Sequence, residues 1–178
     1  MDRIIGFGLA VLLALSGACS LPGRTGAAPR PAGVGVVTDP VDGDTVDVDL
    51  GGVDERVRLI GIDTPESVAH DRPVECFGPE AKARLAELLP RGTEVRLERD
   101  VEARDRFGRL LAYVFRAEDD LHVNLVLVQE GYAEARRFEP NVTRQAELDR
   151  AEDDARAANW GLWPACGGTN TPIGLPPG

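Results

Sequence analysis

Hydrophobic and polar residues alternate along several short stretches of the chain, a pattern typical of β-strands. The clearest stretch is 45–50, where two valines and Leu50 fall on one face and two aspartates on the other. Gly51 and Gly52 then predict a hairpin turn, and 57–62 the returning strand. Further strands are expected at 34–37, 94–99 and 110–115.

Apolar residues at helical spacing predict three helices, at 79–89, 123–130 and 141–158. Pro79 suits the first turn of a helix, and Asn141 is expected to cap the third one. Because strands and helices do not alternate regularly, a parallel α/β sheet is excluded. We therefore predict an α+β, mainly β domain, a small β-barrel with appended helices. Three side chains after the third helix are expected to pack onto the core of the domain: Trp160, Leu162 and Trp163.

The two ends of the 178-residue chain lack this patterning. Residues 1–18 combine a positive start, an apolar run and small residues before Cys19, which predicts a secretory signal peptide. The residues before Cys19 also resemble a bacterial lipoprotein box, so we expect lipidation there and a cell-surface location. An ordinary signal peptide and a secreted protein are the alternative. Residues 19–33 are predicted to be a flexible tether and 167–178 a disordered tail, which leaves 34–166 as one domain.

The three cysteines agree with export. If Cys19 carries a lipid, Cys76 and Cys166 remain, and an oxidising compartment favours a disulfide between them. Two free thiols are the alternative. A zinc site is disfavoured, because two cysteines and two distant histidines show no ligand spacing.

Acidic residues outnumber basic ones by 30 to 20, for a net charge of -10. This excludes a protein that binds nucleic acid through bulk positive charge. A local basic site stays open, because every basic residue except Lys82 is an arginine. Arginine suits phosphate recognition, although a GC-rich genome explains the same bias without any function.

Three polar clusters interrupt the apolar pattern. Residues 42–45 read Asp-Gly-Asp-Thr, 58–66 place charges at the end of an apolar strand, and 105–109 read Asp-Arg-Phe-Gly-Arg. Each cluster alone is ordinary, since Asp-Gly pairs and charged hairpins are common at turns. An EF-hand is excluded, because its ligand spacing is missing.

Together, the clusters supply the groups needed to hydrolyse a phosphodiester without a covalent intermediate. Asp44 and Asp63 are hard oxygen ligands that suit Ca²⁺ or Mg²⁺. Glu66 is a carboxylate able to activate water. Arg58 and Arg109 can hold a phosphate and stabilise the charge that develops on it.

In their order and spacing, these clusters resemble the staphylococcal nuclease (thermonuclease) family. The similarity covers 34–164, and its matching stretches are 41–45, 58–66, 75–81, 105–113 and 123–124, with Gly131 beyond. The resemblance implies an OB-fold, a five-stranded β-barrel with three helices. It also implies a Ca²⁺-dependent endonuclease that cleaves DNA and RNA and leaves 3′-phosphate ends.

The resemblance further implies a role for each matching residue. Asp44 and Asp63 would be Ca²⁺ ligands, together with the carbonyl oxygen of Thr64. Glu66 would be the general base or the group that positions water. The scissile phosphate would be bound by Arg58 and Arg109.

Substrate contacts outside the reacting centre differ from the family pattern. Arg106 and Phe107 stand where the family has a lysine and a tyrosine that contact phosphate and base. Near Arg136 and Arg137, the type member has two tyrosines that pack on the nucleotide, and at most Phe138 keeps an aromatic ring. The type member is also strongly basic, so we expect this chain to bind nucleic acid more weakly.

The alternative is a catalytically silent OB-fold module that binds nucleic acid or a protein at the cell surface. The complete set of metal, base and phosphate-binding residues favours the nuclease, because binding alone needs no such set. We expect a monomer that acts on DNA, RNA or both.

Overall fold

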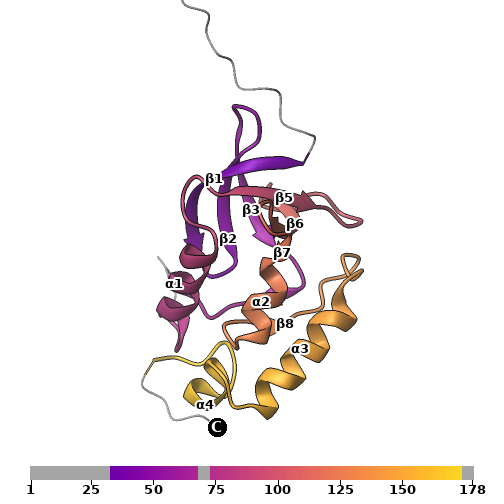
Figure 1. Ribbon diagram of the computed structural model, residues 1–178. Coiled ribbons are helices and arrows are strands. Elements are labelled where there is room, and N and C mark those ends of the chain that lie inside the picture. Colours follow the sequence, from indigo (N-terminus) through magenta and orange to yellow (C-terminus); the bar gives the residue numbers. More distant parts are fainter. Residues whose placement is uncertain (1–32, 68–72, 174–178) are drawn as a thin grey trace, which may run out of the picture.

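Five strands form a closed barrel in the computed structural model, which describes residues 33–67 and 73–173 (Figure 1). Neighbouring strands pair antiparallel in the order β3-β2-β1-β5-β6, and parallel pairing of β3 with β6 closes the ring. Outside the barrel, the short β7 (Leu121–His122) pairs with β6. The predicted five-stranded barrel of the OB-fold type is confirmed. Its strands are β1 (Val34–Asp42), β2 (Thr45–Asp49), β3 (Asp54–Leu59), β5 (Glu94–Glu98) and β6 (Leu110–Arg116).

The helices lie below the barrel in the view of Figure 1. The three predicted helices are present as α1 (Gly78–Leu88), α2 (Val123–Gln129) and α3 (Gln145–Ala157). A short additional helix, α4 (Leu162–Cys166), follows them. Two small strands, β4 (Ile62–Asp63) and β8 (Glu134–Ala135), pair antiparallel beside the barrel.

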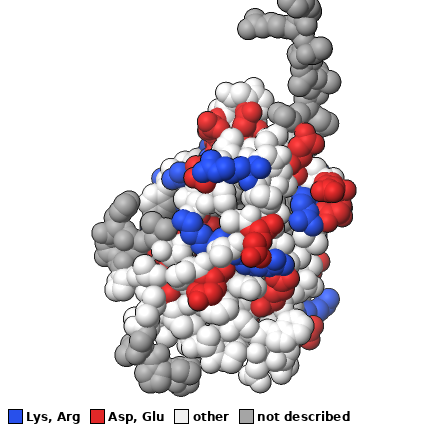
Figure 2. Space-filling model, turned by 60° about the vertical axis from the view of Figure 1, so that its left-hand side comes forward, with Lys and Arg blue, Asp and Glu red and all other residues white. Residues whose placement is uncertain are grey.

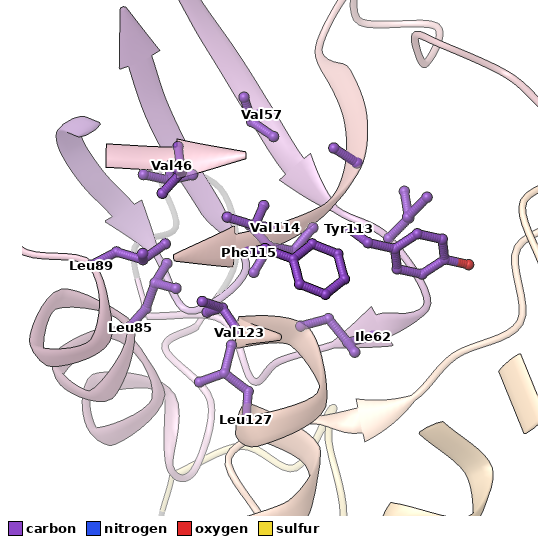
Figure 3. Close-up of a cluster of buried hydrophobic side chains, with 14 of the residues drawn as sticks. Val46, Val57, Ile62, Leu85, Leu89, Tyr113, Val114, Phe115, Val123 and Leu127 are labelled. Atoms are coloured by element: carbon purple, nitrogen blue, oxygen red, sulfur yellow. The ribbon is translucent and has the colours of Figure 1, made fainter. Parts of the chain in front are cut away.

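The alternating valines and leucines of the strands form the barrel interior. Val46 and Val57 face each other across the β2–β3 ladder, and both are fully buried. Figure 3 shows such strand side chains meeting Leu85 of α1 and Leu127 of α2. Burying each of these side chains stabilises the fold by roughly 1.5–3 kcal/mol. Barrel and helices therefore share one hydrophobic core.

Two local predictions are wrong. Asn141 does not cap α3, because Arg144 occupies the N-cap position without a side-chain cap hydrogen bond. Instead the buried Asn141 amide accepts from the Glu102 N–H at 2.8 Å and donates to the Glu102 carbonyl at 3.2 Å. Trp160 is 56% exposed rather than part of the core, whereas Leu162 and Trp163 are buried as expected.

Cys76 and Cys166 are joined by a disulfide, as the cysteine count predicts, with their Cα atoms 5.9 Å apart. The tail expected to be disordered from Gly167 is instead hydrogen-bonded to the domain as far as residue 171, and Pro172 forms a β-bridge with Glu75. The predicted signal peptide, Cys19, all of the tether except Gly33, and residues 174–178 lie outside the described residues. Within the described ranges, no helix is both long and apolar enough to cross a membrane.

Asn124 links the two strands whose parallel pairing closes the barrel. Its fully buried amide donates to the Ile60 carbonyl at 2.8 Å and accepts from the Val114 N–H at 2.9 Å. It therefore satisfies backbone groups both beyond the end of β3 and within β6. A buried backbone group left without a partner costs about 1–3 kcal/mol.

We expect Asn124→Ala to lower the free energy of unfolding by about 3 kcal/mol, because it leaves buried backbone groups unpaired. Urea denaturation of the oxidised protein measures this. The control is Gln129→Ala, which removes an exposed amide from the same helix and should cost less than about 0.5 kcal/mol. Equal losses in the two variants would contradict the assigned role.

His122 is a buried titratable group that packs against the core. Its ring stacks on Phe115 with centroids 4.6 Å apart, and neither ring nitrogen has a hydrogen-bond partner among the described residues. Burial lowers the pKa of His122 from its ordinary 6.5 to about 4. Glu147 opposes this shift and Arg144 adds to it. The folded protein therefore holds His122 neutral at physiological pH.

Because the folded pKa lies below the unfolded one, the unfolded chain takes up the proton first as pH falls. The contribution of His122 to stability is thus complete above about pH 6.5 and is lost toward pH 4, by about 3 kcal/mol in total. Unfolding free energies of wild type and His122→Gln, measured by urea across that range, should diverge with pH. A pH-independent difference would contradict this.

Candidate active site

A polar cavity of about 230 Å³ lies where β2, β3 and β4 meet the C-terminal segment. All six residues predicted to act in metal binding or catalysis line it, although they come from three separate stretches of sequence. The fold thus brings the three polar clusters together. The described lining residues are Asp42, Asp44, Thr45, Arg58, Asp63, Thr64, Glu66, Glu75, Arg109 and Asn170.

Arg58 bridges the two aspartates predicted to bind metal. It leaves β3 opposite Thr45, and only 12% of its side chain is exposed. One terminal nitrogen pairs with the Asp44 carboxylate, and the other lies 3.2 Å from Oδ1 of Asp63. The carbonyl of Ile62 accepts from Arg58 as well, at 3.2 Å. The guanidinium is therefore fixed at the wall of the cavity.

Asp44 is oriented from its other side by Thr64. The Thr64 hydroxyl donates to Oδ2 of Asp44 at 3.1 Å, and the Thr64 N–H lies 3.3 Å from the same oxygen. Burial raises the pKa of Asp63; the nearby Asp44 carboxylate adds to this, while Arg58 acts in the opposite direction. The site thus gathers two partly desolvated carboxylates around one guanidinium.

The donor set decides which metal fits. No group of three or more His, Cys, Asp or Glu side chains within 33–67 and 73–173 is placed as a complete metal site. The two carboxylates and the threonine supply oxygen only, which fits a hard divalent cation such as Ca²⁺ or Mg²⁺. Because Ca²⁺ takes six to eight oxygens, water or substrate oxygens would have to complete its shell.

Glu66 is held through its backbone by Glu75, a residue that sequence reasoning did not single out. The Glu66 N–H donates to the Glu75 carboxylate at 3.0 Å, and the Glu66 carbonyl accepts from the Glu75 N–H at 2.9 Å. Ser67 next to it donates to the Asp42 carboxylate. Both ends of the loop that carries Glu66 are therefore anchored at the cavity. The signal for Glu75 in the sequence was its place at the start of 75–81, a stretch that resembles the family, but no role was assigned to it there.

Arg109 is oriented by the turn that precedes β6. Asp105 accepts from the Arg109 N–H at 2.9 Å and from its Nε at 2.7 Å. Burial alone would raise the pKa of Asp105, but these hydrogen bonds from Arg109 hold it below its usual value. Asp105 also accepts from the N–H of Phe107, so one carboxylate shapes the whole turn.

A second, larger cavity of about 440 Å³ adjoins the polar one, and Arg58 and Arg109 line both. Phe107, 69% exposed, and Phe138, 44% exposed, lie along it. Arg106 stacks over the Phe107 ring at 4.7 Å. Exposed aromatic rings beside arginines suit a base next to a phosphate.

Charges on the surface are interleaved rather than gathered. On the face in Figure 2, basic and acidic side chains alternate, in keeping with ion pairs such as Arg56 with Asp47 and Arg104 with Glu55. Within the described part of the chain, Arg106 and Arg136 form no ion pair. Long-range attraction of a polyanion is therefore weak, and binding depends on local contacts.

Comparison with known proteins decides among the functions this geometry allows. Residues 56–165 match the family described as staphylococcal nuclease homologues. The chain belongs to the staphylococcal nuclease family. Asp44 lies before the matched residues, and the barrel itself brings it to the cavity.

The individual relatives of this staphylococcal nuclease family member support the same assignment. It is 39% identical to the thermonuclease of Staphylococcus intermedius over 123 residues, which cover 69% of this chain and 71% of the relative. It is 35% identical to endonuclease YncB of Bacillus subtilis over 129 residues, 71% of this chain and 60% of that protein. The prophage-derived endonuclease YokF of B. subtilis is 37% identical over 125 residues, 69% of this chain and 41% of its own length.

The expected enzyme class is thereby confirmed. The staphylococcal nuclease domain hydrolyses phosphodiester bonds, and its substrate is nucleic acid. The silent binding module is correspondingly disfavoured.

We expect Phe107→Ala to raise KM for single-stranded DNA about tenfold while leaving kcat within about twofold, because stacking on a base is worth about 1–3 kcal/mol. Steady-state cleavage of a short oligonucleotide measures both constants. Trp160→Ala removes another exposed aromatic side chain, one that does not line the cavity, and it should change neither constant. A loss of kcat in Phe107→Ala with KM unchanged would contradict a binding role.

Proposed function

We propose that this nuclease depends on Ca²⁺, cleaves DNA, RNA or both, and leaves 3′-phosphate ends. One observation carries the proposal: Asp44, Asp63, Glu66, Arg58 and Arg109 line one polar cavity. The product ends rest on the resemblance to the staphylococcal nuclease family. Asp44, Asp63 and the carbonyl oxygen of Thr64 would hold the cation.

Each side chain has a task that its position supports. A cation bound there supplies positive charge to the phosphate oxygens as negative charge builds on them. Glu66, at the edge of the same cavity, takes the proton of the attacking water or holds that water in line. Arg58 and the terminal nitrogens of Arg109 bind the scissile phosphate.

Substrate recognition continues from the polar cavity into the larger one. Arg106 meets a neighbouring phosphate, and Phe107 stacks on a base. Phe138 borders the same cavity, which supports a second stacking contact. The two cavities together offer a residue for every role proposed here, so we propose that the monomer is the active form.

We also propose that the protein works outside the cytoplasm, as a lipoprotein anchored at Cys19 or as a secreted enzyme. The disulfide between Cys76 and Cys166 supports this location, because such bonds persist in oxidising compartments.

We expect the oxidised mature domain, residues 20–178, to cleave nucleic acid with Ca²⁺ and to lose activity in chelator. Single-stranded DNA, duplex DNA and RNA are each assayed with Ca²⁺, Mg²⁺ or chelator. Glu66→Gln should lower kcat by about 10²–10⁴, because a carboxamide cannot accept the proton. Glu118→Gln makes the same change at an exposed turn and should leave kcat unaltered.

Mass spectrometry of the products tests the second part, with 3′-phosphate ends expected. Products with 3′-hydroxyl ends would contradict the proposal, because they would show that the other P–O bond of the phosphodiester is broken. Folded protein that binds the oligonucleotides without cutting them would overturn the enzyme proposal in favour of a binding module.

A further inference from the structure

The C-terminal segment 167–173, here called the C-terminal strap, lies against two glutamates beside the active site. In Figure 1 it is the yellow segment that follows α4. The Thr169 N–H donates to Oε1 of Glu134 at 2.7 Å, and the Asn170 N–H donates to Oε2 of Glu75 at 3.2 Å. The Thr171 carbonyl accepts from the Cys76 N–H at 2.7 Å. The strap therefore bridges two separate parts of the domain through its backbone.

Each of the two glutamates is bound to or paired with a residue proposed to act in metal binding or catalysis. Glu134 of β8 pairs with Asp63 of β4 across the small two-stranded sheet. Glu75 accepts the N–H of Glu66 with the same oxygen, Oε2, that accepts the N–H of Asn170. One carboxylate thus fixes the backbone of Glu66 and is itself fixed by the strap. Asn170 also lines the polar cavity.

A covalent bond holds this arrangement. The disulfide joins Cys76, the residue after Glu75, to Cys166, the residue before the strap, across 90 positions of sequence. Gly168 lets the strap approach, since its φ is +147° and a Cβ there would lie 2.7 Å from Oε1 of Glu134. The family match ends at residue 165, so Cys166 and the strap lie outside the matched residues.

We propose that the C-terminal strap and the Cys76–Cys166 disulfide position Glu66 for catalysis, with Glu75 as the positioning residue, and that breaking the disulfide lowers kcat rather than substrate binding. The inference rests on the proposed role of Glu66. Substrate-binding groups such as Arg106 and Phe107 line the other cavity, away from the strap. A displacement of about 1 Å of a reacting group costs up to about a hundredfold in rate.

The disulfide makes this positioning sensitive to thiols. Reduction adds two electrons and two protons to the bond and yields the thiols of Cys76 and Cys166. Dithiothreitol supplies both and is itself oxidised to its cyclic disulfide. We expect kcat to fall about tenfold or more on reduction, with KM within about threefold, and to recover when dithiothreitol is removed and the protein is reoxidised.

The test compares five variants with the wild type in the Ca²⁺ assay. Ending the chain after Gly168 removes most of the strap but keeps the disulfide, and ending it after Ile173 is the matched control that keeps both. Cys76→Ser combined with Cys166→Ser should show the low kcat and ignore dithiothreitol. Glu75→Gln weakens the hydrogen bonds that this side chain accepts from Glu66 and Asn170 while keeping the strap and the disulfide in the chain, and Glu118→Gln controls for that change.

Thermal unfolding of each variant shows that it is folded at the assay temperature. Lowered kcat with near-constant KM in the shortened chain, the double serine variant and Glu75→Gln is the expected result. Folded variants that keep the wild-type kcat, or in which only KM changes, overturn the inference while the nuclease proposal stands. An oxidised wild type that does not cleave at all overturns both.

Discussion

Parallel pairing of β3 with β6 is the constraint on which the active site depends. The two strands are separated by about fifty residues, so their pairing must offset the entropy of closing a long loop. The pairing sets Arg58 opposite Leu111, and Arg109 comes just before β6. The two phosphate-binding candidates are therefore placed by barrel closure, not by their local sequence. Asn124 stabilises the same junction by satisfying the backbone beyond β3 and within β6.

The ion pairs of the site contribute more to the orientation of its side chains than to the stability of the fold. Removing Arg58, Asp44 and Asp63 from water carries a desolvation cost that their mutual attraction offsets only when the geometry is good. What the arrangement secures is orientation: the guanidinium and both carboxylates already point into the cavity before a substrate arrives. Pre-set dipoles and charges of this kind need little reorganisation during reaction.

The strands and the three main helices could be predicted from the sequence, because each depends on a short-range pattern. Motif spacing also singled out the six candidate residues that the fold gathers at one cavity, and their roles stay predictions. The rest depends on long-range contacts. Asn141 suits a helix cap, but a buried amide pair with Glu102 outweighs the cap. Trp160 is apolar, yet its place after α3 leaves it exposed.

The C-terminal strap escaped prediction for the same reason. Its Gly, Thr, Asn and Pro residues have the composition of a disordered tail. Its order comes from backbone hydrogen bonds to Glu75, Glu134 and Cys76, which no local pattern records. Glu75 begins the matching stretch 75–81, yet its contacts with the backbone of Glu66 are likewise long-range and could not be predicted from that stretch.

The disulfide also has a consequence for the cell that makes the protein. A nuclease is hazardous to the cell that makes it, because that cell's own nucleic acids belong to its substrate class. Cytoplasmic thiols keep cysteines reduced, so a newly made chain would lack the bond between Cys76 and Cys166. By the inference above, the carboxylate of Glu66 would then be poorly placed while the chain is among the nucleic acids of its own cell. With the export proposed above, oxidation outside the cytoplasm would then complete the enzyme away from the nucleic acids of the producing cell. The disulfide between Cys76 and Cys166 would thereby keep the activity of the nuclease low until the bond is formed.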